Sequence, residues 1–101
     1  MAVVALFKGK GFTKTMYEAL RPVVNWETDL APGGMLHVCC FDSDGNVRVT
    51  DVWESEEKMQ AFVGTRLIPG LQKLGIPMPE VELFPAHNVN VYPAATRHML
   101  K

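Results

Sequence analysis

Cysteine is nearly absent from this sequence. The chain has only two cysteines, Cys39 and Cys40, and they are neighbours. A disulfide between adjacent residues is strained and no third cysteine is available, so we expect neither a disulfide framework nor a cysteine zinc motif. Charge of one sign is not in excess either, because ten basic and eleven acidic residues give a net charge of -1. Without a basic excess to neutralise phosphates, nucleic acid is not an expected partner.

Long hydrophobic runs and cofactor motifs are missing as well. No run approaches the roughly 20 apolar residues of a membrane-spanning helix, so we expect no membrane association. The apolar start over residues 1–7 is short for a signal peptide and no cleavage site follows it, which makes the cytoplasm the expected location. The three histidines, at positions 37, 87 and 98, lack metal-ligand spacing. No dinucleotide or haem motif is present, so we expect no metal and no cofactor.

The remaining composition is typical of one globular domain. The chain has 101 residues, of which 48% are hydrophobic and 21% are charged. A chain of this length buries a substantial core, and such a composition argues against disorder. We predict a folded domain over residues 1–92 and a loose tail over residues 93–101.

Hydrophobic periodicity and turn residues divide the domain into six elements. Apolar runs rich in β-branched residues indicate strands, and apolar residues at helical spacing indicate helices. The predicted order is strand, helix, strand, strand, helix, strand, over residues 2–7, 13–24, 35–41, 47–53, 55–74 and 80–92. This βαββαβ order is that of the ferredoxin-like fold, an α+β architecture in which an antiparallel sheet carries two helices on one face.

Three prolines modify these elements. Pro22 is expected to kink or shorten the first helix, since a proline ring clashes with the helix backbone. Pro69 is expected to break the second helix and to begin a new turn, because proline suits a first helical position. Pro85 is expected at a bulge or an edge of the last strand.

The face of the sheet away from the helices carries too many apolar side chains for contact with water. Alternate residues of the segments 35–41 and 47–53 are apolar on both sides of the strands. An open apolar face usually meets a partner. We therefore expect a homodimer that buries sheet against sheet.

The stretch from Val49 to Glu57, which runs from a strand into a helix followed by Phe62, resembles the dimeric α/β-barrel superfamily, which includes the antibiotic-biosynthesis-monooxygenase-like proteins. The resemblance implies a dimeric barrel in which Trp53 points into the cavity. It also implies a cofactor-free activity that relies on the substrate's own reactivity. Haem-degrading relatives place a histidine late in the second helix, where this chain has Gln72, and this difference argues against haem degradation.

The hairpin between the segments 35–41 and 47–53 has two possible registers. A three-residue loop over Ser43–Gly45 places His37 opposite Asp51 and Met35 opposite Trp53. A two-residue turn shifts the pairing by one residue and puts Asp51 on the face away from His37. We favour the first register because it brings His37 and Trp53 together on one face.

His37 and Asp51 are the candidate catalytic residues. A carboxylate beside an imidazole fixes its tautomer and increases its basicity, as a general base requires. The candidate substrate-binding residues are Trp53, Cys39, Phe41 and His87, the last from the mouth of the site or from a partner subunit. Tyr17 lies beside the apolar stripe of the first helix, where we expect it to pack, and the alternative is that its hydroxyl reaches the mouth of the cavity. The alternative is that His37 and Asp51 form a structural cross-strand pair.

Two functions remain open. The first is a cofactor-free, monooxygenase-like enzyme that acts on a small apolar molecule in a cavity between sheet and helices. The second is a non-catalytic barrel that binds a small apolar ligand or serves a stress response, with the His37–Asp51 pair as a structural feature.

Overall fold

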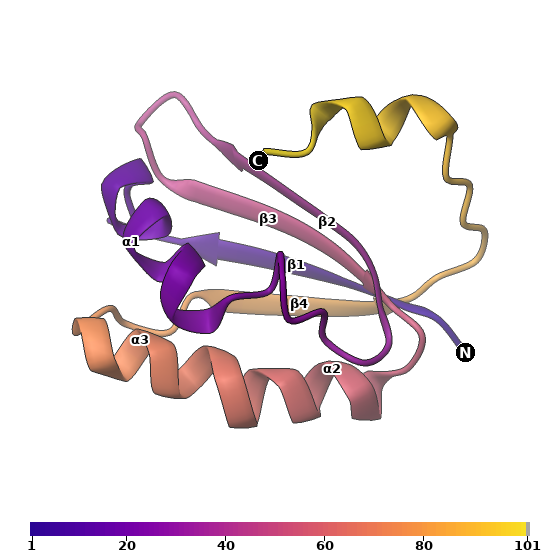
Figure 1. The fold of residues 1–101 in the computed structure, drawn as a ribbon, viewed down its shortest axis with the longest axis horizontal. Coiled ribbons are helices and arrows are strands. Elements are labelled where there is room, and N and C mark those ends of the chain that lie inside the picture. The colour runs from indigo at the N-terminus through magenta and orange to yellow at the C-terminus, as the bar shows by residue number, and fades with distance from the viewer. Residues whose placement is uncertain (101) are drawn as a thin grey trace.

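The computed structural model describes residues 1–100, whose α-helices gather on one side of a single sheet (Figure 1). The elements follow the predicted order, with short helical segments added. They are β1 (Val3–Gly9), α1 (Lys14–Val24), β2 (Gly34–Phe41), β3 (Val47–Trp53), α2 (Glu56–Phe62), the π-helical segment η1 (Val63–Leu67), α3 (Ile68–Leu74), β4 (Glu80–Pro85) and the 3₁₀ helix η2 (Pro93–His98).

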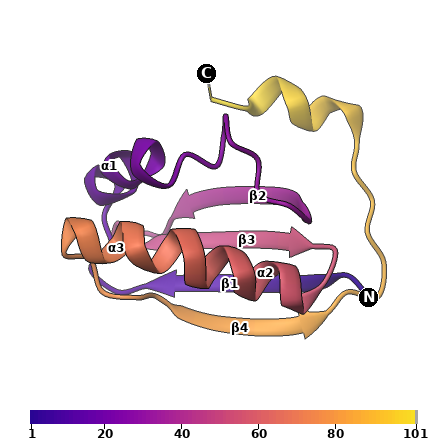
Figure 2. The same cartoon turned by 60° about the horizontal axis from the view of Figure 1, so that its bottom comes forward.

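The four strands form an antiparallel sheet in the order β2-β3-β1-β4. Figure 2 shows α2 and α3 running on as one rod across this sheet, with α1 on the same side. The predicted α+β, ferredoxin-like fold is confirmed, whereas the dimeric barrel stays a prediction. Among the described residues, no helix combines the length and apolar character needed to cross a membrane.

Two clusters of buried apolar side chains fill the space between the helices and the sheet. The first consists of Phe12, Tyr17, Leu20, Val24, Val47, Leu71 and Ile76, and the second of Val3, Ala5, Phe7, Trp53, Met59 and Val63. Val49, Phe62 and Leu67 pack against both clusters, which makes the core continuous. Full burial of a large aliphatic or aromatic side chain contributes about 1.5–3 kcal/mol, so this core is what holds α1 and α2 against the sheet.

α1 begins and ends where the sequence predicts. The Thr13 side chain accepts a hydrogen bond from the backbone N–H of Met16 at 3.4 Å, and α1 begins at the residue after Thr13. The helix contains Pro22 and continues to Val24 before Asn25 ends it in a left-handed conformation with φ 61°. Pro22 therefore does not shorten α1, since only the last turn of the helix follows the proline, and the alternative of a kink at Pro22 stays a prediction.

The second helix keeps its direction at Pro69. In the preceding π-helical segment, the backbone N–H of Ile68 donates to the carbonyl of Val63. Pro69 then lies in the first turn of α3, where a missing N–H costs no intrahelical hydrogen bond. The predicted new turn at Pro69 is confirmed. The predicted break is confirmed for the regular α-helix, which the π-helical segment Val63–Leu67 interrupts just before Pro69, although the rod itself continues (Figure 2).

The β2–β3 hairpin has the favoured register. Gly45 is left-handed with φ 79°, a conformation that glycine adopts without strain. The backbone N–H of Asp42 donates to the carbonyl of Asn46 at 2.9 Å, which closes the three-residue loop. His37 pairs with Asp51 in consequence.

The other end of this strand pair departs from the prediction. Gly34, not Met35, lies opposite Trp53, and the register shifts between Gly34 and Leu36. Met35 is thus the extra residue of a bulge, and it is exposed. A β-carbon on Gly34 would lie 3.6 Å from the Trp53 ring, so the residue without a side chain faces the indole.

β4 is shorter than predicted because its neighbouring strand ends. Pro85 lies opposite Val3, the first residue of β1. The last hydrogen bond beyond this pair runs from the backbone N–H of Ala86 to the carbonyl of Ala2 at 2.8 Å. The predicted strand to residue 92 therefore has no partner beyond this point.

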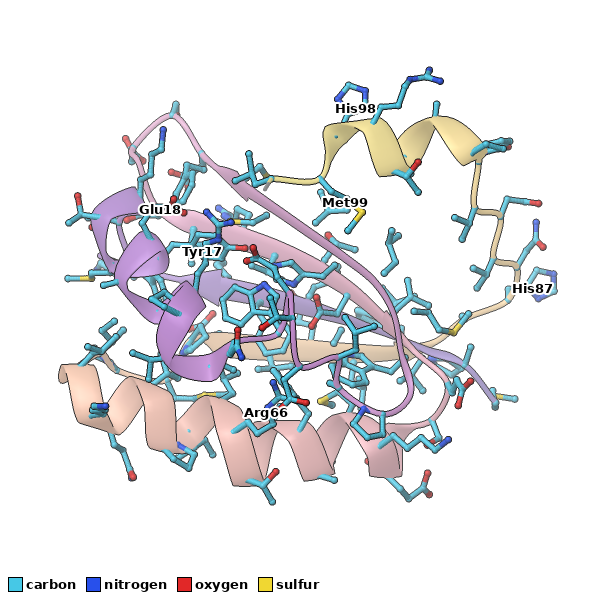
Figure 3. The ribbon with its side chains drawn as sticks, in the orientation of Figure 1. Tyr17, Glu18, Arg66, His87, His98 and Met99 are labelled. Atoms are coloured by element: carbon cyan, nitrogen blue, oxygen red, sulfur yellow. The ribbon has the colours of Figure 1, made fainter. Side chains whose placement is uncertain are left out.

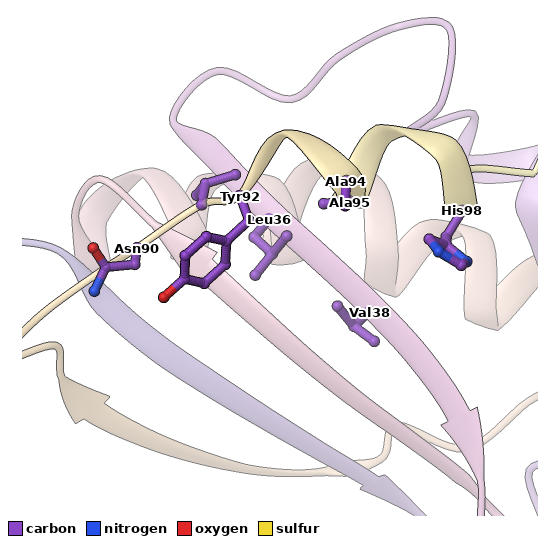
Figure 4. A pocket seen from close by; sticks show the side chains of 8 residues that line it. Leu36, Val38, Asn90, Tyr92, Ala94, Ala95 and His98 are labelled. Carbon is purple, nitrogen blue, oxygen red and sulfur yellow. The ribbon is translucent and has the colours of Figure 1, made fainter.

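The tail that was expected to be loose contains η2, which lies over β2 (Figure 4). Pro93 suits a first helical turn, and the Thr96 hydroxyl donates to its carbonyl at 3.0 Å. The tail and the side chains of Leu36 and Val38 line an open cavity of about 400 Å³ on the sheet face opposite the helices. Lys101, the last residue of the predicted tail, lies outside the described residues.

Candidate functional site

His37 and Asp51 lie side by side on the helix-covered face of the sheet. Nδ1 of His37 is 2.7 Å from Oδ1 of Asp51. The Asp51 side chain is 8% exposed and the His37 side chain is 34% exposed. The strand register thus brings a buried carboxylate against an imidazole that solvent reaches.

Trp53 completes the surroundings of the Asp51 carboxylate. Its indole N–H donates to Oδ2 of Asp51 at 3.3 Å, and its ring lies 5.2 Å from that of Phe62. Trp53 is buried, as the predicted inward orientation requires. A buried carboxylate is costly unless it is hydrogen-bonded, and here each of its oxygens has a partner.

Tyr17 is the residue of this cluster that the sequence did not assign to a site. Its hydroxyl oxygen is 2.8 Å from Nε2 of His37. Tyr17 lies on the buried side of α1 with Leu20 and Val24. The sequence did contain a signal for this role, because Tyr17 is an aromatic residue with a hydroxyl among apolar residues of the helix. A buried tyrosine hydroxyl usually has a hydrogen-bond partner. Only the tertiary fold shows that this partner is His37.

Trp26 is the second residue that the sequence missed, because it stands in a segment read only as a loop. Its ring centre lies 5.3 Å from that of His37 and 5.6 Å from that of Tyr17. Arg66 anchors this loop from η1 (Figure 3): its Nη2 donates to the carbonyls of Val24 at 2.9 Å and of Asp29 at 2.7 Å. The loop holds Trp26 against the imidazole in this way.

Phe41 and Cys39 share the face of His37, as predicted, but neither contacts its ring through a hydrogen bond or an aromatic pair. Phe41 packs edge-on against Tyr17, with ring centres 6.0 Å apart. Cys39 is partly buried beside the first core cluster. Burial raises the pKa of the Cys39 thiol to about 11, so the thiol is protonated at neutral pH and serves packing.

His87 does not lie where the sequence placed it. It stands on an exposed bend after β4 instead of within the strand. Figure 3 shows His87 at one end of the molecule and Tyr17 toward the other, so the two do not meet within one chain. The reason is the early end of β4 at Pro85. A contact of His87 with the site of a partner subunit stays a prediction.

Two cavities of the molecule lie away from His37. One is the cavity beneath the tail, and the other, of about 640 Å³, lies between the β1–α1 loop, the β2–β3 turn and the segment before β4. Neither is lined by His37, Asp51 or Trp53. Tyr17 and Trp26 occupy the space beside the imidazole where the sequence predicted a pocket. Within residues 1–100, no group of three or more His, Cys, Asp or Glu side chains is arranged to hold a metal ion.

No model of a known protein family matches the sequence, and no curated protein matches it either. Solved structures do match. A candidate antibiotic biosynthesis monooxygenase from Chloroflexus aurantiacus J-10-fl is similar with TM-score 0.63 and 17% identity, over 91% of this chain and 100% of that chain. Rv0793 from Mycobacterium tuberculosis is similar with TM-score 0.62 and 15% identity, over 89% and 97% of the two chains.

SnoaB, a cofactor-independent oxygenase from Streptomyces nogalater, is similar with TM-score 0.58 and 19% identity, over 87% of this chain and 93% of that chain. The match covers nearly the full length of all three structures, so it concerns the whole domain. At such identities it shows the architecture, since one fold serves many activities. This chain therefore has the fold of the antibiotic biosynthesis monooxygenase-like proteins.

Proposed function

We propose that this protein is a cofactor-free, monooxygenase-like enzyme that acts on a small apolar molecule, with His37 as its general base. The observation that carries the proposal is the 2.7 Å contact between His37 and the buried Asp51. The fold shared with candidate antibiotic biosynthesis monooxygenases and with a cofactor-independent oxygenase supports it.

In a cofactor-free oxygenation, the group that the protein must supply is a base. A base that removes a proton from an activated CH₂ group or a phenol leaves an anion that itself reacts with dioxygen. When a CH₂ group becomes a carbonyl, one oxygen atom enters the product and the other leaves as water. The substrate supplies all the electrons in that balance. His37 would take the proton, Asp51 would hold the resulting imidazolium, and Trp53 would keep water from the carboxylate.

The proposal includes a cytoplasmic homodimer whose subunits meet through the open sheet face. That face exposes Val38 of β2 and Phe84 of β4, which are 49% and 48% exposed. Burial of apolar surface favours association. His37 and Asp51 lie on the other, helix-covered face of the sheet, so this interface alone does not bring His87 of the partner subunit to them.

A second candidate function is a non-catalytic barrel that binds a small apolar ligand or serves a stress response. One observation favours it: Tyr17 already satisfies Nε2 of His37, at 2.8 Å. In this case the His37–Asp51 pair stabilises the strand pair, and the chain has no turnover.

Oxygen uptake separates the two functions. The purified protein is offered a panel of phenols, hydroquinones and 1,3-diketones, and oxygen consumption is followed together with product mass. An enzyme consumes oxygen above the protein-free rate with at least one of these compounds. His37→Ala should lower that rate by about 10²–10⁴-fold, the usual contribution of a general base. The control His98→Ala, at an exposed position of η2, should retain the rate.

Two results would contradict the proposal. One is the absence of uptake with every compound of the panel. The other is uptake that His37→Ala leaves at the wild-type rate. Ligand binding without uptake in the same samples would support the non-catalytic barrel.

A further inference from the structure

Asp51 fixes the direction of a chain of hydrogen bonds that crosses three elements. The Trp53 indole can only donate, so Oδ2 of Asp51 accepts at 3.3 Å. An ionised carboxylate also only accepts, so the partner of Oδ1 at 2.7 Å, Nδ1 of His37, must carry a proton.

The direction continues from His37 to Tyr17. A neutral imidazole with its proton on Nδ1 has a lone pair on Nε2. The Tyr17 hydroxyl, 2.8 Å away, must therefore donate to Nε2. Burial raises the pKa of Tyr17 above its ordinary value, so the hydroxyl keeps the proton that it donates.

The core holds the Tyr17 hydroxyl in place. The Tyr17 ring is 8% exposed and belongs to the first core cluster. It packs against Trp26, and its plane is within 5° of the His37 ring plane. A side chain packed on all sides has little rotamer freedom, so the position of the hydroxyl is set by α1 rather than by solvent.

We propose that Tyr17 is a positioning residue for His37, whose hydroxyl holds the imidazole ring in one orientation with Nε2 as the basic nitrogen. This inference rests on the proposed function insofar as His37 is the base. A hydroxyl is suited to the role because it both donates and accepts. It donates to Nε2 of the neutral ring, and it can turn to accept from Nε2–H once His37 has taken a proton. A phenylalanine at position 17 can do neither.

Nitrogen NMR of the imidazole rings tests this role without any substrate. The chain has three histidines and two tyrosines, so the spectra are simple, and the exposed His87 and His98 provide reference rings. At a pH where the rings are neutral, we expect the His37 proton on Nδ1 alone. In Tyr17→Phe, the His37 ring loses its partner at Nε2 and can turn away from Asp51 more often. The Nδ1 proton should therefore exchange with water about fivefold faster, the factor expected when one hydrogen bond that holds the ring is lost. Tyr92→Phe, at an exposed position in the tail, should leave the exchange unchanged.

Two results overturn the proposal. The first is a wild-type spectrum in which Nε2 of His37 carries the proton, and this measurement decides the matter even if Tyr17→Phe does not fold. The second is a folded Tyr17→Phe variant whose His37 exchange rate and nitrogen shifts equal those of Tyr92→Phe. Because neither spectrum depends on turnover, a failed oxygen-uptake assay and a failed role for Tyr17 are told apart.

Discussion

Asp51 is the buried charged residue of residues 1–100, and its environment explains why it is tolerated there. Its two oxygens accept from an imidazole and from an indole, which offsets much of the cost of removing a carboxylate from water. The Asp51 carboxylate also fixes the positions of the His37 and Trp53 side chains, because both donate hydrogen bonds to it. A polar cluster of this kind is sensitive to the loss of any one partner.

The two adjacent cysteines should differ in reactivity. The thiolate is the reactive form of cysteine, and burial raises the pKa of Cys39 to about 11. At pH 8 the Cys39 thiol is therefore protonated, and its alkylation should become appreciable only as the pH rises toward 11. Cys40 is exposed and should be labelled first. Mass spectrometry of the iodoacetamide-treated protein checks this order, and equal labelling of both residues at pH 8 would contradict it.

At this scale, the sequence predicts the residues that strand geometry brings together. His37 and Asp51 follow from the loop length and from Gly45, since a β register is a local property. Tyr17 and Trp26 do not follow, because they approach His37 from α1 and from the loop after it. Contacts between elements distant in the sequence depend on the packing of the whole fold, which no local pattern encodes.

The β2–β3 turn is the element that sets the register of the site, and Gly45 is its critical residue. A β-carbon at Gly45 would meet no atom within 4 Å, but its φ is 79°. Gly45→Ala should therefore lower the free energy of unfolding through backbone strain alone, by about 1–2 kcal/mol.

Gly64 provides the matched control for this change. It also has open space around it, but it lies in the π-helical segment without a positive φ. Gly64→Ala should be neutral or stabilising by up to about 1 kcal/mol, because alanine favours helical conformations. Urea unfolding of both variants measures the difference. Equal effects of the two substitutions would show that the turn conformation is not the cause.

The sequence predicts the bounds of an element well where residues of that element determine them. It predicts them poorly where an adjacent strand determines them. The Thr13 cap and the turn at Pro69 follow from local chemistry. The Met35 bulge places Gly34 opposite Trp53, a residue of the neighbouring strand. The early end of β4 arises because β1 begins at Val3 and offers no further partner. Neither the bulge at Met35 nor the early end of β4 can be predicted from the residues of the affected strand alone.

The open sheet face is the feature of the whole molecule from which its assembly is predicted. The tail lies beside Leu36 and Val38 of β2 on this face, and Val38 stays 49% exposed. Phe84 pairs in register with Val4 on that same face and is 48% exposed. An apolar surface that the chain's own tail does not cover is the basis for the predicted homodimer.

A charged side chain at position 84 should prevent the predicted homodimer from forming. In Phe84→Glu, a carboxylate would have to be buried between the two sheets, so light scattering should return the monomer mass of 11.2 kDa. Leu30→Glu, which alters an exposed apolar residue in the α1–β2 loop, should retain the dimer. A wild-type protein that is monomeric at micromolar concentration would contradict the predicted dimer.

The central claim is that Asp51 and His37 act together to remove a proton. Oxygen uptake by Asp51→Asn, with the compound that the wild-type protein consumes, tests this claim most directly. The amide that replaces the carboxylate can donate to Nδ1 of His37, which favours the tautomer with a proton on Nε2 and leaves no base there. We predict a kcat lowered by about 10²-fold or more with KM little changed. A folded Asp51→Asn variant with the wild-type kcat would contradict the account.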